Sequence, residues 1–171
     1  YRLEPGPESA HSLGIMYILR DEYQKAATYL QEAVKGENID NETLAQWNYE
    51  LALVNMNLEK HCEAIGYARE AINLKDDFSD ALILLGDAFI ASRNNLGDNF
   101  QQQTAFWAAA DQYRKAVQAD PSAEQKARKR LNESMGQYPG SEDVFFQDLK
   151  DGEPYLVGGC INETTTVQPG V

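Results

Sequence analysis

The chain has very few of the side chains that usually carry chemistry. Its 171 residues include only two histidines and two cysteines. His61 and Cys62 are neighbours, but adjacent positions on a helix do not face each other, so they do not make a nucleophile and base pair. The sequence also contains no phosphate-binding loop, no dinucleotide-binding glycine motif and no nucleophile elbow. We therefore predict that the protein is not an enzyme and that it uses no metal or cofactor.

Positive charge is scarce as well. Lysine and arginine total 15 against 27 aspartate and glutamate residues, which gives a formal net charge of −12. Nucleic acid is bound mainly by Lys and Arg that neutralise phosphates, so we expect no nucleic-acid partner. No apolar run approaches the ~20 residues that a membrane span needs, so no span is expected. An acidic surface keeps a protein soluble, and it also suits a basic or neutral protein partner.

The two cysteines, Cys62 and Cys160, lie far apart in the sequence. Their spacing matches neither a metal site nor a disulfide framework. We expect two separate thiols, one on a helix and one in a strand, with a single bridge as the less favoured alternative.

Apolar and small residues recur at helical spacing in the middle of the chain. The stretch 80–89 carries Leu82, Leu85, Gly86 and Phe89. The stretch 109–121 carries Ala109, Tyr113, Ala116 and Val117. Because steps of three and four residues place each set on one helix face, these stretches predict a helical hairpin. The small residues mark where the two helix backbones approach closely.

Related patterns occur twice upstream. Leu13, Gly14 and Tyr17 open the first, and Leu51 and Ala52 open the second. Gly14 and Ala52 are 38 positions apart, and Ala52 and Gly86 are 34 apart. The chain therefore resembles the tetratricopeptide repeat (TPR) family, whose period is about 34 residues. The resemblance implies an all-α fold, a right-handed superhelix of helical hairpins closed by a capping helix.

The third repeat departs from this family pattern. Gly86 and Ala109 are 23 positions apart, where about 12 are usual. Asp98 and Gln101 have the spacing of a helix-capping pair, and no helix breaker follows until Pro121. We therefore predict a second helix about three turns too long, which projects roughly 16 Å beyond its partner and carries Phe100 and Trp107.

The last part of the chain changes character. We predict a repeat array over residues 1–138, with repeats at about 7–38, 42–76 and 79–121 and a capping helix at 122–138. Residues 139–171 form a tail, in which Val144, Phe145 and Leu149 are expected to pack back on the array. A small β-hairpin follows, with a tight turn at Asn162 and Glu163.

The tail resembles the C-terminal segment of exported Bacteroidetes-type TPR proteins of unknown function. The residues that carry this resemblance include Phe145, Phe146, Asp151, Gly152, Tyr155, Val157, Gly158, Ile161, Asn162, Glu163, Thr165, Thr166 and Val167. It implies a bacterial protein in the periplasm or associated with the outer membrane, with a cytoplasmic location as the alternative.

The TPR resemblance implies a scaffold that binds a peptide or protein segment in a concave groove. The family's groove positions fall here on His11, Ile15, Ile18, Tyr49, Leu53, Met56, Asp87 and Ile90. In chaperone-binding members Lys, Asn and Arg clamp a C-terminal carboxylate. Glu8, Ser12, Glu50 and Asp80 stand where such residues would be wanted, so a carboxylate clamp is disfavoured.

Two non-enzymatic alternatives to groove binding remain open at this point, and an enzyme, the third alternative, would need a closed pocket that pairs His11 or His61 with a carboxylate. The groove positions could be covered by an upstream repeat or by the chain's own tail, which would leave no open groove. The protein could instead assemble with itself as a homodimer or larger homo-oligomer, through Phe100 and Trp107 on the projecting helix. In that case replacement of Trp107 by alanine would abolish the dimer.

Overall fold

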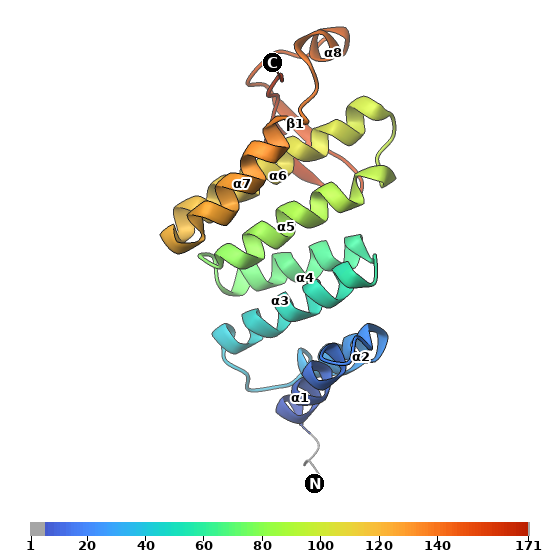
Figure 1. The fold of residues 1–171 in the computed structure, drawn as a ribbon, viewed down its shortest axis with the longest axis vertical. Helices are drawn as coiled ribbons and strands as arrows, with labels where there is room; N and C mark the ends of the chain where they lie inside the picture. Colours follow the sequence, from blue (N-terminus) through green and yellow to red (C-terminus); the bar gives the residue numbers. More distant parts are fainter. Residues whose placement is uncertain (1–5, 171) are drawn as a thin grey trace. The chain divides into compact units, whose positions relative to one another are not determined.

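The computed structural model describes residues 6–170, and the chain divides into two units between Asp76 and Asp77. The first unit contains two antiparallel helix pairs, labelled in Figure 1. Helices α1 (Pro7–Ile18) and α2 (Tyr23–Ala33) form the first pair. Helices α3 (Asn41–Asn57) and α4 (His61–Leu74) form the second. Each pair packs as a hairpin, as the sequence pattern predicts.

Glycine is needed where α1 crosses α2. A β-carbon at Gly14 would lie 2.7 Å from two side-chain carbons of Leu30, closer than two carbons can approach. Leu30 is completely buried. The backbone of α1 lies this close to the Leu30 side chain of α2, so only a residue without a β-carbon fits at this position of the repeat pattern.

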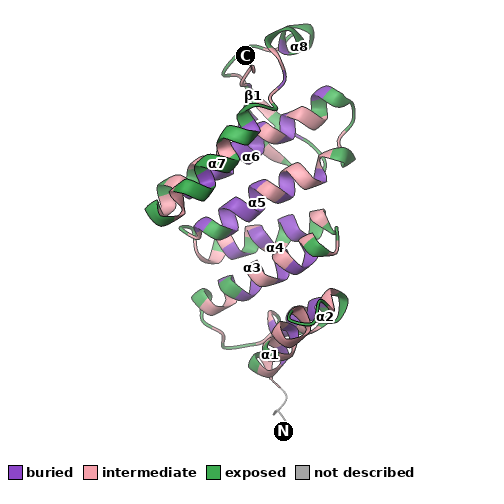
Figure 2. Ribbon diagram, in the orientation of Figure 1, coloured by how far each residue is buried: buried purple, intermediate pink, exposed green. Residues whose placement is uncertain are grey.

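The second unit begins with another helix pair, α5 (Ser79–Ser92) and α6 (Asn99–Ala119), joined through the short 3-10 helix η1 (Arg93–Asn95). Helix α6 has 21 residues against 14 in α5, so it is longer than its partner as predicted, but the excess of seven residues is about two turns rather than three. Its start is fixed by Asp98 and Gln101, each of which bonds the other's backbone N–H through its side chain. Figure 2 shows the burial concentrated along α5, where ten of the 14 residues are buried.

Two further helices follow. The 3-10 helix η2 (Pro121–Ala123) leads into α7 (Glu124–Met135), which packs along α6 as the predicted capping helix. The Asp120 side chain accepts a bond from the Ser122 backbone N–H and so caps this turn. Helix α8 (Ser141–Phe146) is a short segment. Val144 is buried as predicted, but Phe145 is 76% exposed, so the expectation that Phe145 packs back on the array is wrong.

The tail ends in a two-stranded antiparallel sheet of β1 (Pro154–Val157) and β2 (Glu163–Thr166), in which Pro154 pairs with Thr166 and Val157 with Glu163. The connection is the five-residue loop 158–162 rather than the predicted tight turn. Gly159 and Asn162 adopt positive φ angles in it. Both strands pack on α6. A two-stranded sheet is marginal alone, so α6 supplies the surface that stabilises it.

Together these elements confirm the predicted class, an all-α array of helical hairpins with a capping helix and a small C-terminal β-hairpin.

The expectation of two thiols is wrong. Neither cysteine is free, and Cys62 at the start of α4 and Cys160 in the strand connection are both disulfide-bonded. Separation along the sequence says little about distance in the fold, so spacing alone could not exclude a bridge.

Candidate functional site

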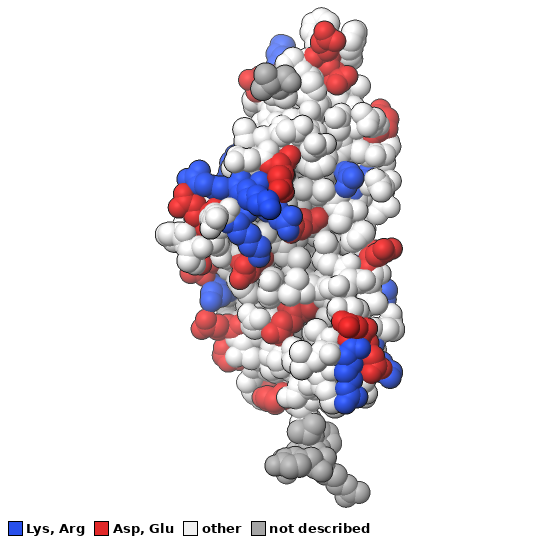
Figure 3. All heavy atoms as spheres, viewed as in Figure 1, with Lys and Arg blue, Asp and Glu red and all other residues white. Residues whose placement is uncertain are grey.

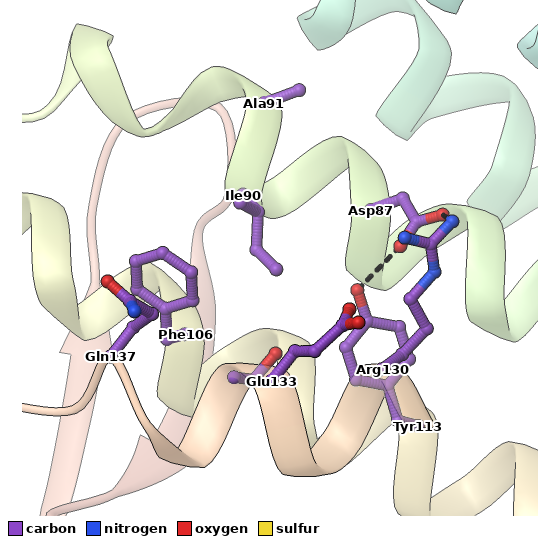
Figure 4. A pocket seen from close by; sticks show the side chains of 9 residues that line it. Asp87, Ile90, Ala91, Phe106, Tyr113, Arg130, Glu133 and Gln137 are labelled. Atoms are coloured by element: carbon purple, nitrogen blue, oxygen red, sulfur yellow. Dashed lines mark hydrogen bonds and ion pairs between the residues drawn. The ribbon is translucent and has the colours of Figure 1, made fainter. Parts of the chain in front are cut away.

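A cavity of about 450 Å³ lies between α5, α6 and α7 in the second unit. Its size falls within the range of about 300 to 1,000 Å³ that is usual for binding pockets. Figure 4 shows the side chains around it. Its lining residues are Asp87, Ile90 and Ala91 from α5, Phe106 and Tyr113 from α6, and Arg130, Glu133, Ser134 and Gln137 from α7 and the turn after it.

One end of the cavity is polar and is organised around Asp87. The Tyr113 hydroxyl donates a hydrogen bond of 2.7 Å to Asp87 Oδ1. The Arg130 guanidinium lies 3.1 Å from Asp87 Oδ2. Burial raises the pKa of Asp87, while the Tyr113 hydrogen bond and the charge of Arg130 oppose this rise. Burial, followed by the charge of Asp87, raises the pKa of the Tyr113 hydroxyl well above its ordinary value.

The position of Tyr113 depends on the glycine of the repeat pattern. A β-carbon at Gly86 would lie 2.6 Å from Tyr113 Cε1, so glycine is needed for the ring to lie this close to α5. The Tyr113 ring is completely buried, and its hydroxyl reaches Asp87 one residue further along α5. The close contact between α5 and α6 therefore also builds the polar end of the cavity.

On the side away from Asp87 the cavity has an apolar wall of Ile90, Ala91 and Phe106, and Figure 4 shows Gln137 on this side as well. Figure 4 shows the Ile90 side chain directed from α5 into the space near the Phe106 ring. The Arg93 guanidinium lies 5.7 Å from the centre of that ring, a cation–π contact that helps to orient it. The cavity thus joins an apolar wall to a charged end.

The cavity brings together two of the residues predicted to bind a partner, Asp87 and Ile90. In the first unit, the predicted groove residue His11 makes contacts of its own. Its ring stacks on Trp47 with centroids 4.6 Å apart, and its Nε2 lies 2.6 Å from Glu50 Oε2. Ile18 packs against the core cluster around Leu30. Ile15, Tyr49, Leu53 and Met56 are half-buried on α1 and α3.

Phe100 and Trp107 do not lie on a bare, projecting helix, and this expectation is corrected. Trp107 is 0% exposed and Phe100 is 9% exposed, in a cluster with Val144 and Val167 of the tail. The Trp107 indole N–H donates a 2.7 Å hydrogen bond to the Gln168 carbonyl oxygen. The chain's own tail therefore covers the extra length of α6, and these two aromatic residues are not available to a second copy.

Lysine and arginine gather on α7, visible as the blue region over that helix in Figure 3. Three of these residues pair with nearby carboxylates: Lys126 with Asp80, Arg128 with Glu124, and Arg130 with Asp87. Across residues 6–170 we find no group of three His, Cys, Asp or Glu side chains that could hold a metal ion. None of the helices in this range is long and apolar enough to cross a membrane.

No protein-family model matches the sequence, and no curated protein matches it. Solved TPR structures are similar to it. The TPR2B domain of yeast Sti1 in complex with pHsp70 has a TM-score of 0.63 and 19% identity, covering 77% of this chain and 97% of that chain. The second TPR domain of human RPAP3 in complex with the HSP70 peptide SGPTIEEVD has a TM-score of 0.57 and 17% identity, over 75% and 98%.

A thermophilic TPR protein from Thermus thermophilus is also similar, with a TM-score of 0.59 and 16% identity over 83% of this chain and 75% of that chain. At these identities the likeness establishes the fold. The chain has the TPR fold, with a C-terminal β-hairpin packed on its longest helix.

Proposed function

We propose that this protein is a non-enzymatic scaffold that binds a segment of another protein in the cavity between α5, α6 and α7. The observation that carries the proposal is the cavity itself, which lies at groove positions of the third repeat and combines an apolar wall with a charged end. Solved structures of the same fold hold peptides of other proteins. A peptide side chain anchored on Ile90 and Phe106 fits this arrangement.

A display selection with random-sequence peptides tests the proposal, with the whole chain as the bait. Peptides that the chain enriches are expected to lose binding to an Ile90→Glu variant, because a carboxylate on the apolar wall repels apolar side chains. Leu156→Glu is the matched control, since Leu156 is 60% exposed on β1 and lies outside this cavity. Equal binding to Ile90→Glu and to the control would place the site elsewhere.

Self-assembly through α6 is no longer supported, because the tail covers Phe100 and Trp107.

An extracytoplasmic location remains our proposal. It is supported by the two disulfide-bonded cysteines, since disulfides persist mainly in oxidising compartments. Fractionation of the source cells tests this location, and recovery of the chain with reduced thiols in the cytoplasm would refute it.

A further inference from the structure

Among the described residues that line the cavity, two are carboxylates, Asp87 and Glu133, and one is a cation, Arg130. Two further cations lie outside the lining: Arg93 on the Phe106 ring and Lys126, whose charge acts on Asp87. Arg130 pairs with Asp87, at 3.1 Å. Within residues 6–170, the Glu133 carboxylate has no ion-pair partner. Figure 4 shows it reaching from α7 toward the polar end of the cavity, beside Tyr113 and Arg130.

We infer that the cavity selects a lysine or arginine side chain of the bound segment, an inference that rests on the proposed function. The aliphatic stem of such a side chain would lie along Ile90 and Phe106, and its cationic head would reach Glu133. Long cationic side chains bury an apolar stem and keep a polar tip, which matches a cavity with one apolar and one acidic end. The formal net charge of −12 favours the approach of the same kind of segment.

This preference is the opposite of the one expected for an acidic C-terminal peptide such as SGPTIEEVD, which the human RPAP3 domain holds. An acidic side chain in this cavity would face Glu133 and Asp87. Among the described residues that line the cavity, Arg130 is the one cation that could attract it, and its guanidinium is already paired with Asp87. The local chemistry therefore discriminates between the two classes of peptide.

The test uses blocked tripeptides of the form Ala-Xaa-Ala as probes and the isotope-labelled whole chain, observed by NMR. Xaa is lysine, arginine, norleucine or glutamate, and norleucine keeps the stem of lysine without its charge. We expect lysine and arginine to shift the amide signals of Ile90 and Glu133 and to bind about three to ten times more tightly than norleucine. That range is usual for a partly exposed ion pair or charge-assisted hydrogen bond.

Three substitutions extend the test. Glu133→Gln should abolish the advantage of lysine over norleucine. Glu142→Gln on α8 makes the same charge change on an exposed helix away from the cavity and should change nothing. Arg130→Met should strengthen lysine binding, because Asp87 then also lacks its cation.

The outcomes distinguish this inference from the proposal that the cavity binds a segment of another protein. If norleucine and lysine shift the same cavity signals with equal affinity, or if glutamate binds best, the cavity binds peptides and the cationic selection is refuted. If no probe moves any cavity signal while displayed peptides still bind at another surface, both the inference and the cavity proposal are refuted.

Discussion

Replacement of Trp107 by alanine tests the packing of the tail on α6. The Trp107 side chain is completely buried and makes edge contacts with Phe100 and Tyr155, at centroid distances of 6.0 Å and 5.5 Å. Its N–H also holds the Gln168 carbonyl oxygen at 2.7 Å. The substitution therefore removes the largest side chain of the cluster that joins the tail to the helix.

Truncation of a buried tryptophan to alanine destabilises a protein by about 3–5 kcal/mol. The lost hydrogen bond adds about 1 kcal/mol, because Gln168 is only half-buried and water can replace the indole donor. The expected loss is therefore about 4–6 kcal/mol in the free energy of unfolding of the second unit. This is a large part of the ~5–15 kcal/mol that usually stabilises a folded protein. Trp107→Phe keeps a ring in place and should lose only about 1–2 kcal/mol.

Urea unfolding followed by circular dichroism measures the loss, and limited proteolysis shows whether the tail becomes accessible to cleavage. We expect Trp107→Ala to unfold at a lower urea concentration and its tail to be cut first. An unfolding curve within about 1 kcal/mol of the wild type, together with a fall from dimer to monomer mass, would refute the reasoning. That result would mean that Trp107 lies in an interface between two copies of the chain.

Three further predictions follow from single contacts. Gly86→Ala should lower the free energy of unfolding, measured in urea, by about 1–3 kcal/mol, because the new β-carbon would overlap the Tyr113 ring. Gly66→Ala in α4 should raise it by about 0.4–1 kcal/mol, because a β-carbon there would have no neighbouring atom within 4 Å. Burial raises the pKa of Asp87, so its contribution to stability is greatest below the ordinary Asp pKa of about 3.9 and is lost as pH rises through the raised value. The unfolding free energy of the wild type minus that of Asp87→Asn should therefore fall as the pH rises above the ordinary Asp pKa of about 3.9, and a rise would contradict the assignment. Mass spectrometry of the denatured chain should find no thiol alkylation before reduction and two alkylated cysteines after it, whereas labelling without reductant would disprove the disulfide-bonded state.

Local patterns in the sequence were sufficient to predict the helix pairs. Gly14 and Gly86 lie at close helix contacts that a β-carbon would prevent. Because the same contact recurs in each repeat, a small residue recurs at the same position of the sequence pattern. The length of α6 was also predictable, because Asp98 and Gln101 cap its start and no breaker follows until Pro121. These features depend on residues close together in the chain, or on a repeat whose geometry is the same each time.

The packing of the tail was not predictable in the same way. Trp107 and Gln168 are 61 positions apart, and no repeat relates them. The sequence predicts that an aromatic residue beyond the end of a normal repeat is exposed, because it does not show that the tail covers this residue. The polar end of the cavity escaped prediction for the same reason, because it needs Tyr113 from α6 and Arg130 from α7 to meet Asp87 from α5.

The same residues therefore serve the repeat architecture and the candidate site. Gly86 allows the Tyr113 ring to lie against α5, and the ring brings its hydroxyl to Asp87. Tyrosine at this position fills the space between the two helices, and its hydroxyl bonds to Asp87. Phenylalanine would meet the same packing demand without holding Asp87. Tyr113→Phe therefore separates the two roles, because it preserves the contact with Gly86 and removes one of the two groups that hold the Asp87 carboxylate.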